Sequence, residues 1–245
     1  MIVGICGSGN MAAAMARGWV GEAERMLFSD SGSGRARQLA EELGGEAVSN
    51  AELAQRADVV VLAVKPAKLA QVARELAGAR VVVSLLGATR LEDVAAVFPG
   101  TEVVRVMPNL GVEVGLGVLC VAGGGDDEVR GLLEKLGHLV DLAEEQFDAA
   151  TAVMGCAPAY LALAVEAIAD AGAKEGLDEE LARELVVETT AGTAALLRLR
   201  HPADVRRAVA SPGGSTEAGL EALDREGVRE GFEAAVRASL ERMRG

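Results

Sequence analysis

The order of apolar runs along the chain constrains its fold more than any other feature. Before about residue 148, short runs rich in Val and Ile alternate with longer stretches rich in Ala, Leu, Glu and Arg. Four runs have the length and continuous apolar character of buried strands: residues 2–6, 58–64, 80–85 and 102–106. Strands that alternate with helices form right-handed crossovers, which build a mostly parallel sheet with helices on both faces. The chain therefore begins with an α/β domain of the doubly wound type.

Helices are expected between these strands, at residues 11–20, 34–44, 50–56, 66–78 and 90–97. Residues 116–122 and 138–142 read as two further strands, with a helix over 126–136 between them. From Ala149 the β pattern ends, and helices are predicted over 150–174, 178–199, 202–210 and 216–244. The sequence thus predicts two domains, 1–148 and 149–245. Because Ala-rich helices leave apolar faces that one copy cannot bury, we expect the helical domain to form a homodimer.

Charge and cysteine content exclude several protein classes. The 245 residues carry 37 acidic and 24 basic side chains, a net charge of −13, which disfavours a nucleic-acid binder. No uncharged apolar run reaches about 18 residues, so no membrane span is expected. The start, MIVGICGSGNM, lacks the basic region of a signal peptide. The three cysteines and two histidines are too dispersed for a disulfide framework or a metal site, so we expect a cytoplasmic, metal-free protein.

A glycine-rich loop directly follows the first strand and directly precedes a helix. Its residues are Gly7-Ser8-Gly9-Asn10-Met11-Ala12. The first glycine permits a tight turn, the second lets the backbone approach a pyrophosphate, and the small Ala12 lets the helix pack near the strand. The N-terminus of that helix then offers an anion site. In this context the loop indicates a Rossmann-type dinucleotide-binding domain, with a ligand-free turn as the alternative.

The second strand should end near Phe28-Ser29-Asp30, about 20 residues beyond Gly9, where such domains read the adenosine ribose. Asp30 would accept a hydrogen bond from a free 2′-hydroxyl, which favours NADH. The neighbouring hydroxyls and cations would suit a 2′-phosphate, which favours NADPH; they are Ser29, Ser31, Ser33, Arg35 and Arg37. These signals conflict, and we favour NADPH with NADH as the alternative. A plain turn formed by Asp30 and the serines is a third interpretation.

Two further segments carry candidate binding groups. Ala63-Val64-Lys65-Pro66 ends a predicted strand beside the ligand crevice, where Lys65 would reach a phosphate or be solvated, and Pro66 would stiffen the backbone. Ser211-Pro212-Gly213-Gly214 reads as a turn, and Ser215-Thr216 precede a helical pattern. The N–H groups of Gly213 to Thr216 would then point outward and bind a carboxylate. An ordinary capped helix start is the alternative.

Five motifs occur in order along essentially the whole chain: Gly7-x-Gly9-Asn10-Met11, Ala63-Val64-Lys65-Pro66, Val104-Arg105-Val106-Met107-Pro108-Asn109, Pro158-Ala159-Tyr160 and Ser211-Pro212-Gly213-Gly214-Ser215-Thr216. Together they resemble the pyrroline-5-carboxylate reductase family. The last motif is the most specific, because other Rossmann dehydrogenases lack it. The resemblance implies reduction of 1-pyrroline-5-carboxylate to L-proline with NADPH or NADH. It also implies a Rossmann domain followed by a helical dimerisation domain, assembled in some members into a ring of dimers.

The resemblance assigns roles by position. It implies that the cofactor is lined by Cys6, Gly7, Ser8, Gly9, Asn10, Met11, Asn50, Ala63, Val64, Lys65 and Pro66, and that Met107, Pro108 and Asn109 lie near the nicotinamide. It implies that the substrate is held by Ser211, Gly213, Gly214, Ser215 and Thr216. The Thr216 hydroxyl matches the group beside the substrate ring nitrogen, which makes Thr216 the candidate catalytic residue. Glu144 lies where some members carry a glutamate on the substrate side.

The cofactor supplies the hydride, so the chain must hold the substrate C=N about 3–3.5 Å from the nicotinamide. No matched motif contains a histidine, so water or an already protonated substrate is the simplest source of the proton. Tyr160 is a conceivable acid, but a tyrosine within a helix is more often a packing residue. Cys156 is likewise expected to be a small buried apolar residue rather than a reactive thiol.

The chain also departs from the family pattern at three places. Leu110-Gly111 replaces Thr-Pro, Met154-Gly155-Cys156 replaces Ser-Gly-Ser, and Leu86-Gly87-Ala88 replaces Ala-Ala-Gly. These differences leave two alternatives open. One is a paralogous NAD(P)H-dependent reductase of another cyclic imine or keto acid, and the other is a non-catalytic nucleotide-sensing dimer.

Overall fold

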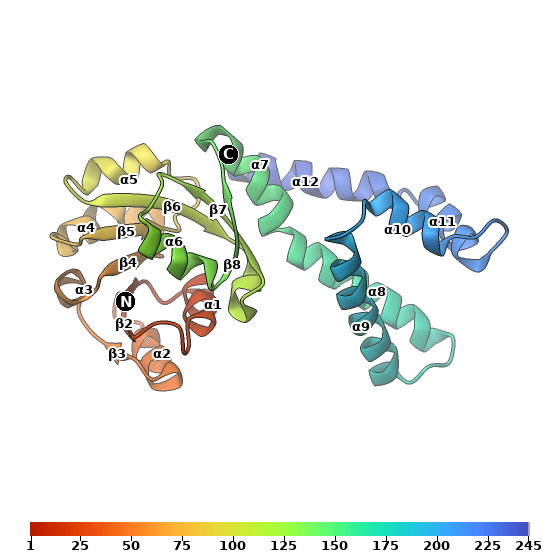
Figure 1. The fold of residues 1–245 in the computed structure, drawn as a ribbon, viewed down its shortest axis with the longest axis horizontal. Coiled ribbons are helices and arrows are strands. Elements are labelled where there is room, and N and C mark those ends of the chain that lie inside the picture. The colour runs from red at the N-terminus through yellow and green to blue at the C-terminus, as the bar shows by residue number, and fades with distance from the viewer. Residues whose placement is uncertain (245) are drawn as a thin grey trace. The chain divides into compact units, whose positions relative to one another are not determined.

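The computed structural model describes residues 1–244 and divides the chain into two compact units. The first unit comprises Met1–Cys156 and the C-terminal residues from Arg242, and the second comprises Ala157–Glu241. The first contains a sheet with helices, and the second contains helices only (Figure 1). This arrangement confirms the predicted fold class. The expected boundary at residue 148, between a cofactor-binding domain and a domain for dimerisation and substrate binding, stays a prediction.

One eight-stranded sheet forms the centre of the first unit, in the order β3-β2-β1-β4-β5-β6-β7-β8. The strands are β1 (Ile2–Cys6), β2 (Arg25–Ser29), β3 (Glu46–Ala47), β4 (Val59–Leu62), β5 (Val81–Ser84), β6 (Glu102–Pro108), β7 (Gly117–Ala122) and β8 (Gly137–Asp141). All pairs from β3 to β6 are parallel, whereas β7 runs antiparallel to β6 and parallel to β8. Chain order reverses between β1 and β4, and open α/β sheets bind their ligands at such a point.

Each face of the sheet is covered by three α-helices. The first face packs against α1 (Asn10–Gly18), α2 (Arg35–Leu43) and α6 (Asp127–Glu134). The second packs against α3 (Asn50–Arg56), α4 (Leu69–Glu75) and α5 (Leu91–Val97). Trp19, just beyond α1, is fully buried, and its indole nitrogen donates to the Leu132 carbonyl of α6 at 2.9 Å. Alanines fill the inner side of α1, so this helix lies close to the strands.

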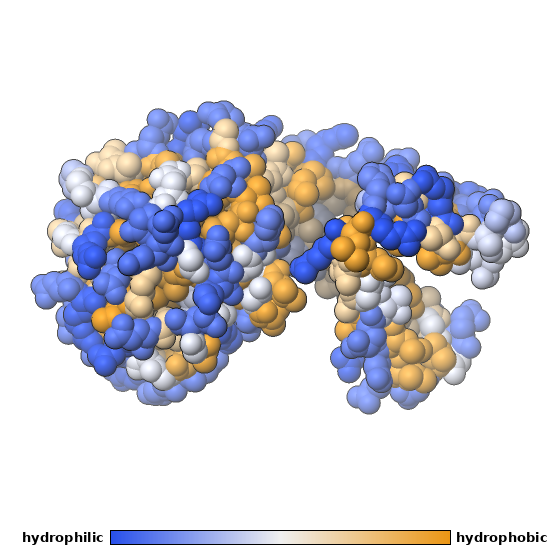
Figure 2. All heavy atoms as spheres, in the orientation of Figure 1, coloured by the Kyte–Doolittle hydropathy of each residue, from blue (hydrophilic) through white to orange (hydrophobic). Residues whose placement is uncertain are grey.

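Helices make up the second unit: α8 (Ala157–Lys174), α9 (Glu179–Leu197), α10 (Pro202–Val209), α11 (Ser215–Arg225) and α12 (Val228–Arg244), whose last residues belong to the first unit. Asp178 caps α9 as predicted, accepting from the N–H groups of Glu180 and Leu181. Apolar side chains gather on the surface of these helices (Figure 2). The stretch Glu144–Lys174 is long and apolar enough to cross a membrane by length and composition. The same apolar surface suits helices that a second copy covers.

Several predicted elements differ in detail. The helix expected over 216–244 is two helices, because the chain turns at Gly227 with φ +70. The helix expected over 66–78 begins as the 3-10 turn η1 (Pro66–Lys68), and α4 ends at Glu75. Before α8 the chain forms η3 (Glu144–Gln146), α7 (Phe147–Ala150) and the π-helical turn η4 (Thr151–Gly155). The two-residue strand β3 was not predicted, because so short an edge strand has no periodicity to detect.

Candidate functional site

Parallel pairing places the carboxyl ends of β1, β2, β4 and β6 at one edge of the sheet. The residues predicted to line the cofactor lie at these ends or on the loops that follow them. They are Cys6 to Met11 after β1, Ser29 and Asp30 after β2, Ala63 to Pro66 after β4, and Met107 to Asn109 at β6. Asn50 joins them from the start of α3. The structure therefore gathers every predicted cofactor residue at one edge of the first unit.

The glycine loop ties three strands together. Gly7 has φ +99, and a Cβ there would lie 2.5 Å from the Ala63 carbonyl oxygen, so only glycine fits. The Gly7 N–H donates to the Ser29 carbonyl at 2.9 Å, and the Ser8 hydroxyl lies 3.2 Å from the same oxygen. These contacts within the protein set the conformation of the glycine loop.

Lys65, just beyond β4, is exposed.

Gly9 differs from Gly7, because a Cβ added to it would meet no protein atom within 4 Å. Gly9 is the N-cap of α1 and offers no capping side chain, so the first N–H groups of the helix have no such acceptor. An uncapped helix start beside an open glycine suits a phosphate group. These residues therefore fit the pyrophosphate of a dinucleotide.

Asn50 connects three strand and helix ends. Its Oδ1 accepts from the Ser29 hydroxyl at 2.5 Å and from the Cys6 thiol at 3.3 Å. Its Nδ2 donates to Glu75 of α4 at 2.6 Å. Burial raises the pKa of the Cys6 thiol to about 11; the nearby Glu75 charge adds to this, and the Ser29 hydroxyl opposes it. Cys6 is therefore a protonated hydrogen-bond donor at neutral pH.

The Asp30 carboxylate is engaged within its own loop. It accepts from the Gly32 N–H at 2.7 Å, the Ser33 hydroxyl at 2.8 Å and the Ala36 N–H at 2.9 Å. Partial burial raises the pKa of this carboxyl, but the hydrogen bonds from Ala36, Ser33 and Gly32 together hold the pKa below its usual value. Both oxygens thus have partners without a ribose hydroxyl.

Arg35 is the first residue of α2, directly after the Asp30 loop. Its Nη2 donates to Asn10 Oδ1 at 3.1 Å, which places a cation beside the start of α1. The arginine and the serines Ser31 and Ser33 are all exposed. The loop therefore presents hydroxyls and one positive charge close to the glycine loop.

At the end of β6, Asn109 makes two side-chain hydrogen bonds. Its Oδ1 accepts from the Val118 N–H of β7 at 3.1 Å, and its Nδ2 donates to the Met154 carbonyl of η4 at 3.2 Å. Leu110, which replaces a family threonine, is half exposed at the start of η2 (Leu110–Val114). Sequence reasoning did not anticipate the contact between Asn109 and η4.

Sequence reasoning also missed a buried ion pair between Arg105 of β6 and Glu144 of η3. The resemblance placed Glu144 on the substrate side, but its carboxylate instead faces Arg105 and the Leu91 N–H. Arg105 is 4% exposed. A lone arginine inside the run EVVRVMP was the available signal, because a charge within a buried strand needs a partner.

The candidate substrate segment lies in the second unit, where α11 begins at Ser215 with Gly214 as its N-cap. Two of the four amides expected to point outward already have acceptors. The Gly213 N–H donates to Glu217 Oε2 at 2.6 Å, and the Gly214 N–H donates to the Ser211 carbonyl at 2.9 Å. The loop is therefore closed by hydrogen bonds from its own amides to the Glu217 carboxylate and the Ser211 carbonyl. The first-turn N–H groups of Ser215 and Thr216 have no capping side chain.

Tyr160 and Cys156 were weighed as acid or reactive groups. The Tyr160 hydroxyl lies 2.6 Å from Ser239 Oγ and 3.4 Å from the Ala235 carbonyl, so it joins α8 to α12. This is the packing role expected for it. Cys156, at the end of η4, is only partly buried, so the expectation of a fully buried residue is wrong. The widened π turn keeps its side chain near the surface.

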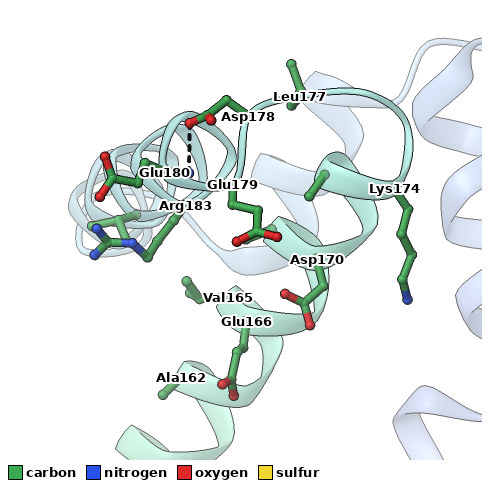
Figure 3. Close-up of a pocket in the computed structure, with 13 residues that line it drawn as sticks. Ala162, Val165, Glu166, Asp170, Lys174, Leu177, Asp178, Glu179, Glu180 and Arg183 are labelled. Carbon is green, nitrogen blue, oxygen red and sulfur yellow. Dashed lines mark hydrogen bonds between the residues drawn. The ribbon is translucent and has the colours of Figure 1, made fainter.

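A wide hollow of about 1090 Å³ opens between α8 and α9 (Figure 3). Acidic side chains enter it from both helices, among them Glu166, Asp170 and Glu179. None of the residues selected from the sequence as site residues lines it. The candidate residues therefore lie in two places, at the sheet edge of the first unit and at the start of α11 in the second.

Comparison with known proteins agrees with both halves of this picture. Residues 144–245 match a family model described as pyrroline-5-carboxylate reductase dimerisation. Residues 2–87 match one described as NADP oxidoreductase, coenzyme F420-dependent. A curated relative named pyrroline-5-carboxylate reductase, from Thermus thermophilus, is 39% identical over 85% of this chain and 82% of its own length.

Two solved structures cover the whole fold. The 1-pyrroline-5-carboxylate reductase of Streptococcus pyogenes superposes with a TM-score of 0.88 at 30% identity, over 99% of this chain and 98% of that one. The Plasmodium falciparum pyrroline carboxylate reductase, solved with NADP bound, gives 0.85 at 26% identity, over 99% and 97%. The identity to the Thermus protein and the match over residues 144–245 are sufficient to assign a family. This chain belongs to the pyrroline-5-carboxylate reductase family.

Proposed function

We propose that this chain catalyses the reduction of 1-pyrroline-5-carboxylate to L-proline by hydride transfer from NAD(P)H, the last step of proline biosynthesis. One observation carries the proposal: this member of the family has both a candidate cofactor-binding loop and a candidate substrate-binding segment. One is the uncapped glycine loop at Gly7–Gly9 in the first unit. The other is the Ser211–Thr216 segment at the start of α11.

The cofactor would lie along the carboxyl edge of the sheet. Its pyrophosphate would rest on Gly9 and the start of α1, and its nicotinamide would lie near Met107, Pro108 and Asn109. When bound, the reduced nicotinamide supplies the hydride. The remaining lining comes from Cys6, Gly7, Ser8, Asn10, Met11, Ser29, Asp30, Asn50, Ala63, Val64, Lys65 and Pro66.

The preferred cofactor is NADPH. The Asp30 carboxylate has about four acceptor positions, and three of them already accept hydrogen bonds from its own loop, which reduces its capacity to receive a ribose hydroxyl. Arg35, held beside Asn10, offers a positive charge to a 2′-phosphate. We expect Arg35→Gln to raise KM for NADPH by about ten-fold and to leave KM for NADH nearly unchanged. Arg74→Gln, at an exposed position of α4, serves as the control for charge alone.

The substrate would be held by the start of α11. Ser211, Gly213 and Gly214 shape the turn, and the N–H groups of Ser215 and Thr216 bind the carboxylate. The Thr216 hydroxyl hydrogen-bonds the ring nitrogen and so orients the C=N. Hydride adds to the carbon of this bond, and the nitrogen carries a proton taken from water before transfer. Thr216 is therefore the one side chain assigned a catalytic role.

The enzyme acts on a small molecule and oligomerises through its dimerisation region. We propose a homodimer as the working unit, with a ring of dimers as a further level of assembly. Residues 1–148 would serve the cofactor, and residues 149–245 would serve dimerisation and the substrate. We expect a cytoplasmic enzyme that needs no metal, nucleic acid or membrane.

The direct test follows absorbance at 340 nm with purified protein, each reduced cofactor, and pyrroline-5-carboxylate present or absent. Substrate-dependent oxidation, faster with NADPH, is the expected result. Thr216→Val should lower kcat by about 10²–10³-fold while NADPH still binds, because the hydroxyl that accepts from the protonated ring nitrogen is lost. Thr190→Val, which removes a hydroxyl of α9 that donates to Val186, is the matched control. Cofactor binding without turnover of this substrate would refute the proposal.

A further inference from the structure

The Arg105–Glu144 ion pair is buried inside the first unit. The Nη1 of Arg105 donates to Glu144 Oε1, and the guanidinium carbon lies 4.4 Å from the centre of the Phe147 ring. The Arg105 side chain is 5% exposed and that of Glu144 is 14% exposed. Water is therefore almost excluded from both charges.

This pair is incompletely satisfied. Among residues 1–244, Arg105 Nε and Glu144 Oε2 are buried and have no hydrogen-bond partner. Removing two charges from water is costly, and their attraction compensates only where the remaining polar atoms are also paired. Apolar side chains of similar volume would stabilise this position at least as well. A directional role explains the pair better than stability does.

A second contact joins the same two segments further along. Four residues beyond Arg105 and directly after β6, Asn109 donates to the carbonyl of Met154, which lies ten residues beyond Glu144. Ten helical residues rise about 15 Å, and four strand residues span about 13 Å. The segment 144–155 therefore covers about the same distance as β6 between the two contacts and runs alongside it. We call the two contacts, Arg105–Glu144 and Asn109–Met154, the two-point clamp.

The topology of the sheet makes the two-point clamp possible. Because β7 runs antiparallel to β6, Ala122 pairs with Arg105, and β8 then follows β7 in parallel. The chain consequently leaves β8 level with Arg105 and returns along β6 toward Pro108. A fully parallel sheet would have delivered the segment to the opposite end.

We propose that Arg105 and Glu144 are positioning residues that fix the end of β6 against the segment 144–155. This inference rests on the proposed function, which places the nicotinamide near Met107, Pro108 and Asn109. A salt bridge with a defined direction sets the register of β6 more narrowly than apolar packing does. Loss of the pair should therefore disturb hydride transfer more than it disturbs cofactor binding.

Three variants of the full-length enzyme separate positioning from stability. Glu144→Gln leaves the arginine charge buried without its counter-ion. The double variant Arg105→Met with Glu144→Leu removes both charges and keeps the volume filled. Asp141→Asn breaks the exposed Arg130–Asp141 pair of the same unit and is the matched control. For each, we would measure thermal midpoint, NADPH affinity by fluorescence, kcat, KM and amide hydrogen exchange without cofactor.

The double variant is the decisive case. We expect its thermal midpoint to lie within about 3 °C of the wild type and its NADPH affinity within about two-fold. Its kcat should fall by about 10–100-fold, because small misplacements near the reacting atoms are costly. Amides of Met107, Asn109 and residues 151–156 should exchange faster than in the wild type. Glu144→Gln should show the same kinetic loss with a lower midpoint, and Asp141→Asn should show neither.

Two outcomes would overturn the inference. Recovery of wild-type kcat in the double variant would show that the pair serves packing alone. Unchanged exchange at Met107 and Asn109 in both pair variants would show that the pair does not order the end of β6. If the wild type itself fails to reduce pyrroline-5-carboxylate, the proposed function fails, and the exchange measurement still decides whether the two-point clamp orders β6.

Discussion

At the scale of single residues, two carboxylates hydrogen-bond to the backbone of their own loops. Asp30 accepts from the turn that leads into α2, and Glu217 accepts from the Gly213 N–H at the start of α11. The two have opposite consequences for ligands. Asp30 keeps few free acceptor positions for a ribose hydroxyl, whereas Glu217 places a negative charge beside the amides proposed to bind the substrate carboxylate.

Glu217→Gln should therefore lower KM for pyrroline-5-carboxylate. Two unit charges about 4 Å apart in watery surroundings repel by about 1 kcal/mol, which corresponds to about five-fold in affinity. We expect kcat to change little, because the glutamate is not assigned to the reacting atoms. Glu221→Gln, one turn further along α11, removes the same charge and should leave KM unchanged. A higher KM in Glu217→Gln would contradict the proposed position of the carboxylate.

The Cys6 thiol makes stability depend on alkaline pH. Its pKa is about 11 in the folded protein, mainly because it is buried, against 9.0 for the free thiol. Above pH 9 the unfolded chain ionises this thiol while the folded chain keeps it protonated, so the free energy of unfolding falls as pH rises toward 11. At about 1.4 kcal/mol per pKa unit, the loss amounts to about 2–3 kcal/mol.

Urea unfolding of cofactor-free protein at pH 8 and pH 10.5, with reductant, measures this loss. In Cys6→Ala the decrease between the two pH values should be smaller than in the wild type, because the titrating group is gone. Other groups that titrate in this range, Cys120 among them, contribute equally to both proteins. An identical decrease in the two proteins would rule out a raised pKa at Cys6.

At the scale of elements, one glycine decides where α11 ends and α12 begins. Gly227 sits between them with φ +70, and its N–H donates to the Asp224 carbonyl at 3.1 Å. A side chain is strained in this conformation. Gly231, inside α12, has an ordinary helical backbone, and a Cβ there would meet nothing within 4 Å.

The two glycines should respond to alanine with opposite signs. Gly227→Ala should lower the free energy of unfolding by about 1 kcal/mol or more. Gly231→Ala should raise it by about 0.5–1 kcal/mol, since alanine favours the helix. Denaturant unfolding at one fixed protein concentration compares them. Equal destabilisation by both would mean that the junction does not depend on the left-handed conformation.

The same junction shows which elements can be predicted. Val-rich runs located β1, β4, β5 and β6 well, because buried strands leave a strong local pattern. The break at Gly227 was missed, since a single glycine is also tolerated within a helix. The antiparallel direction of β7 was missed too, because a run of buried residues looks the same in either direction. Neither the helix break at Gly227 nor the direction of β7 leaves a distinctive pattern in the local sequence.

The candidate site divides in the same way. Cys6 and Asn50 were selected from the family resemblance and Ser29 from its place at the end of the second strand, and the three meet in one hydrogen-bonded cluster. Arg105 and Glu217 were missed as site features, because their partners come from distant or folded-back segments. Local chemistry can be predicted from a short motif, whereas a pairing such as Arg105 with Glu144 requires the fold.

At the scale of the whole molecule, large apolar side chains remain exposed on the second unit. Leu163 and Ile168 of α8 are 64% and 60% exposed, and similar residues follow along α9. A soluble chain rarely leaves so many on one set of helices. Residues 144–245 match a dimerisation family model, and we propose that this surface is the contact between copies.

Leu163→Glu combined with Ile168→Glu should therefore yield monomers. Burying two unpaired carboxylates in an apolar contact is strongly unfavourable. Sedimentation velocity measures the change, and the wild type should sediment as a dimer or larger assembly. Val20→Glu, at a 54% exposed position of the first unit, is the matched control. A wild-type assembly that persists in the double variant would place the contact on other residues.

The turn from Asp30 to Ala36 is organised by a carboxylate that it supplies itself. Substitutions at Ser31, Ser33 or Arg35 therefore change the groups presented to a ligand without disturbing the strands beneath. The residues of such a turn can be substituted independently of the sheet. The preference of this chain between phosphorylated and unphosphorylated cofactors can therefore be changed in this turn alone, while the residues of the sheet edge and α11 stay the same.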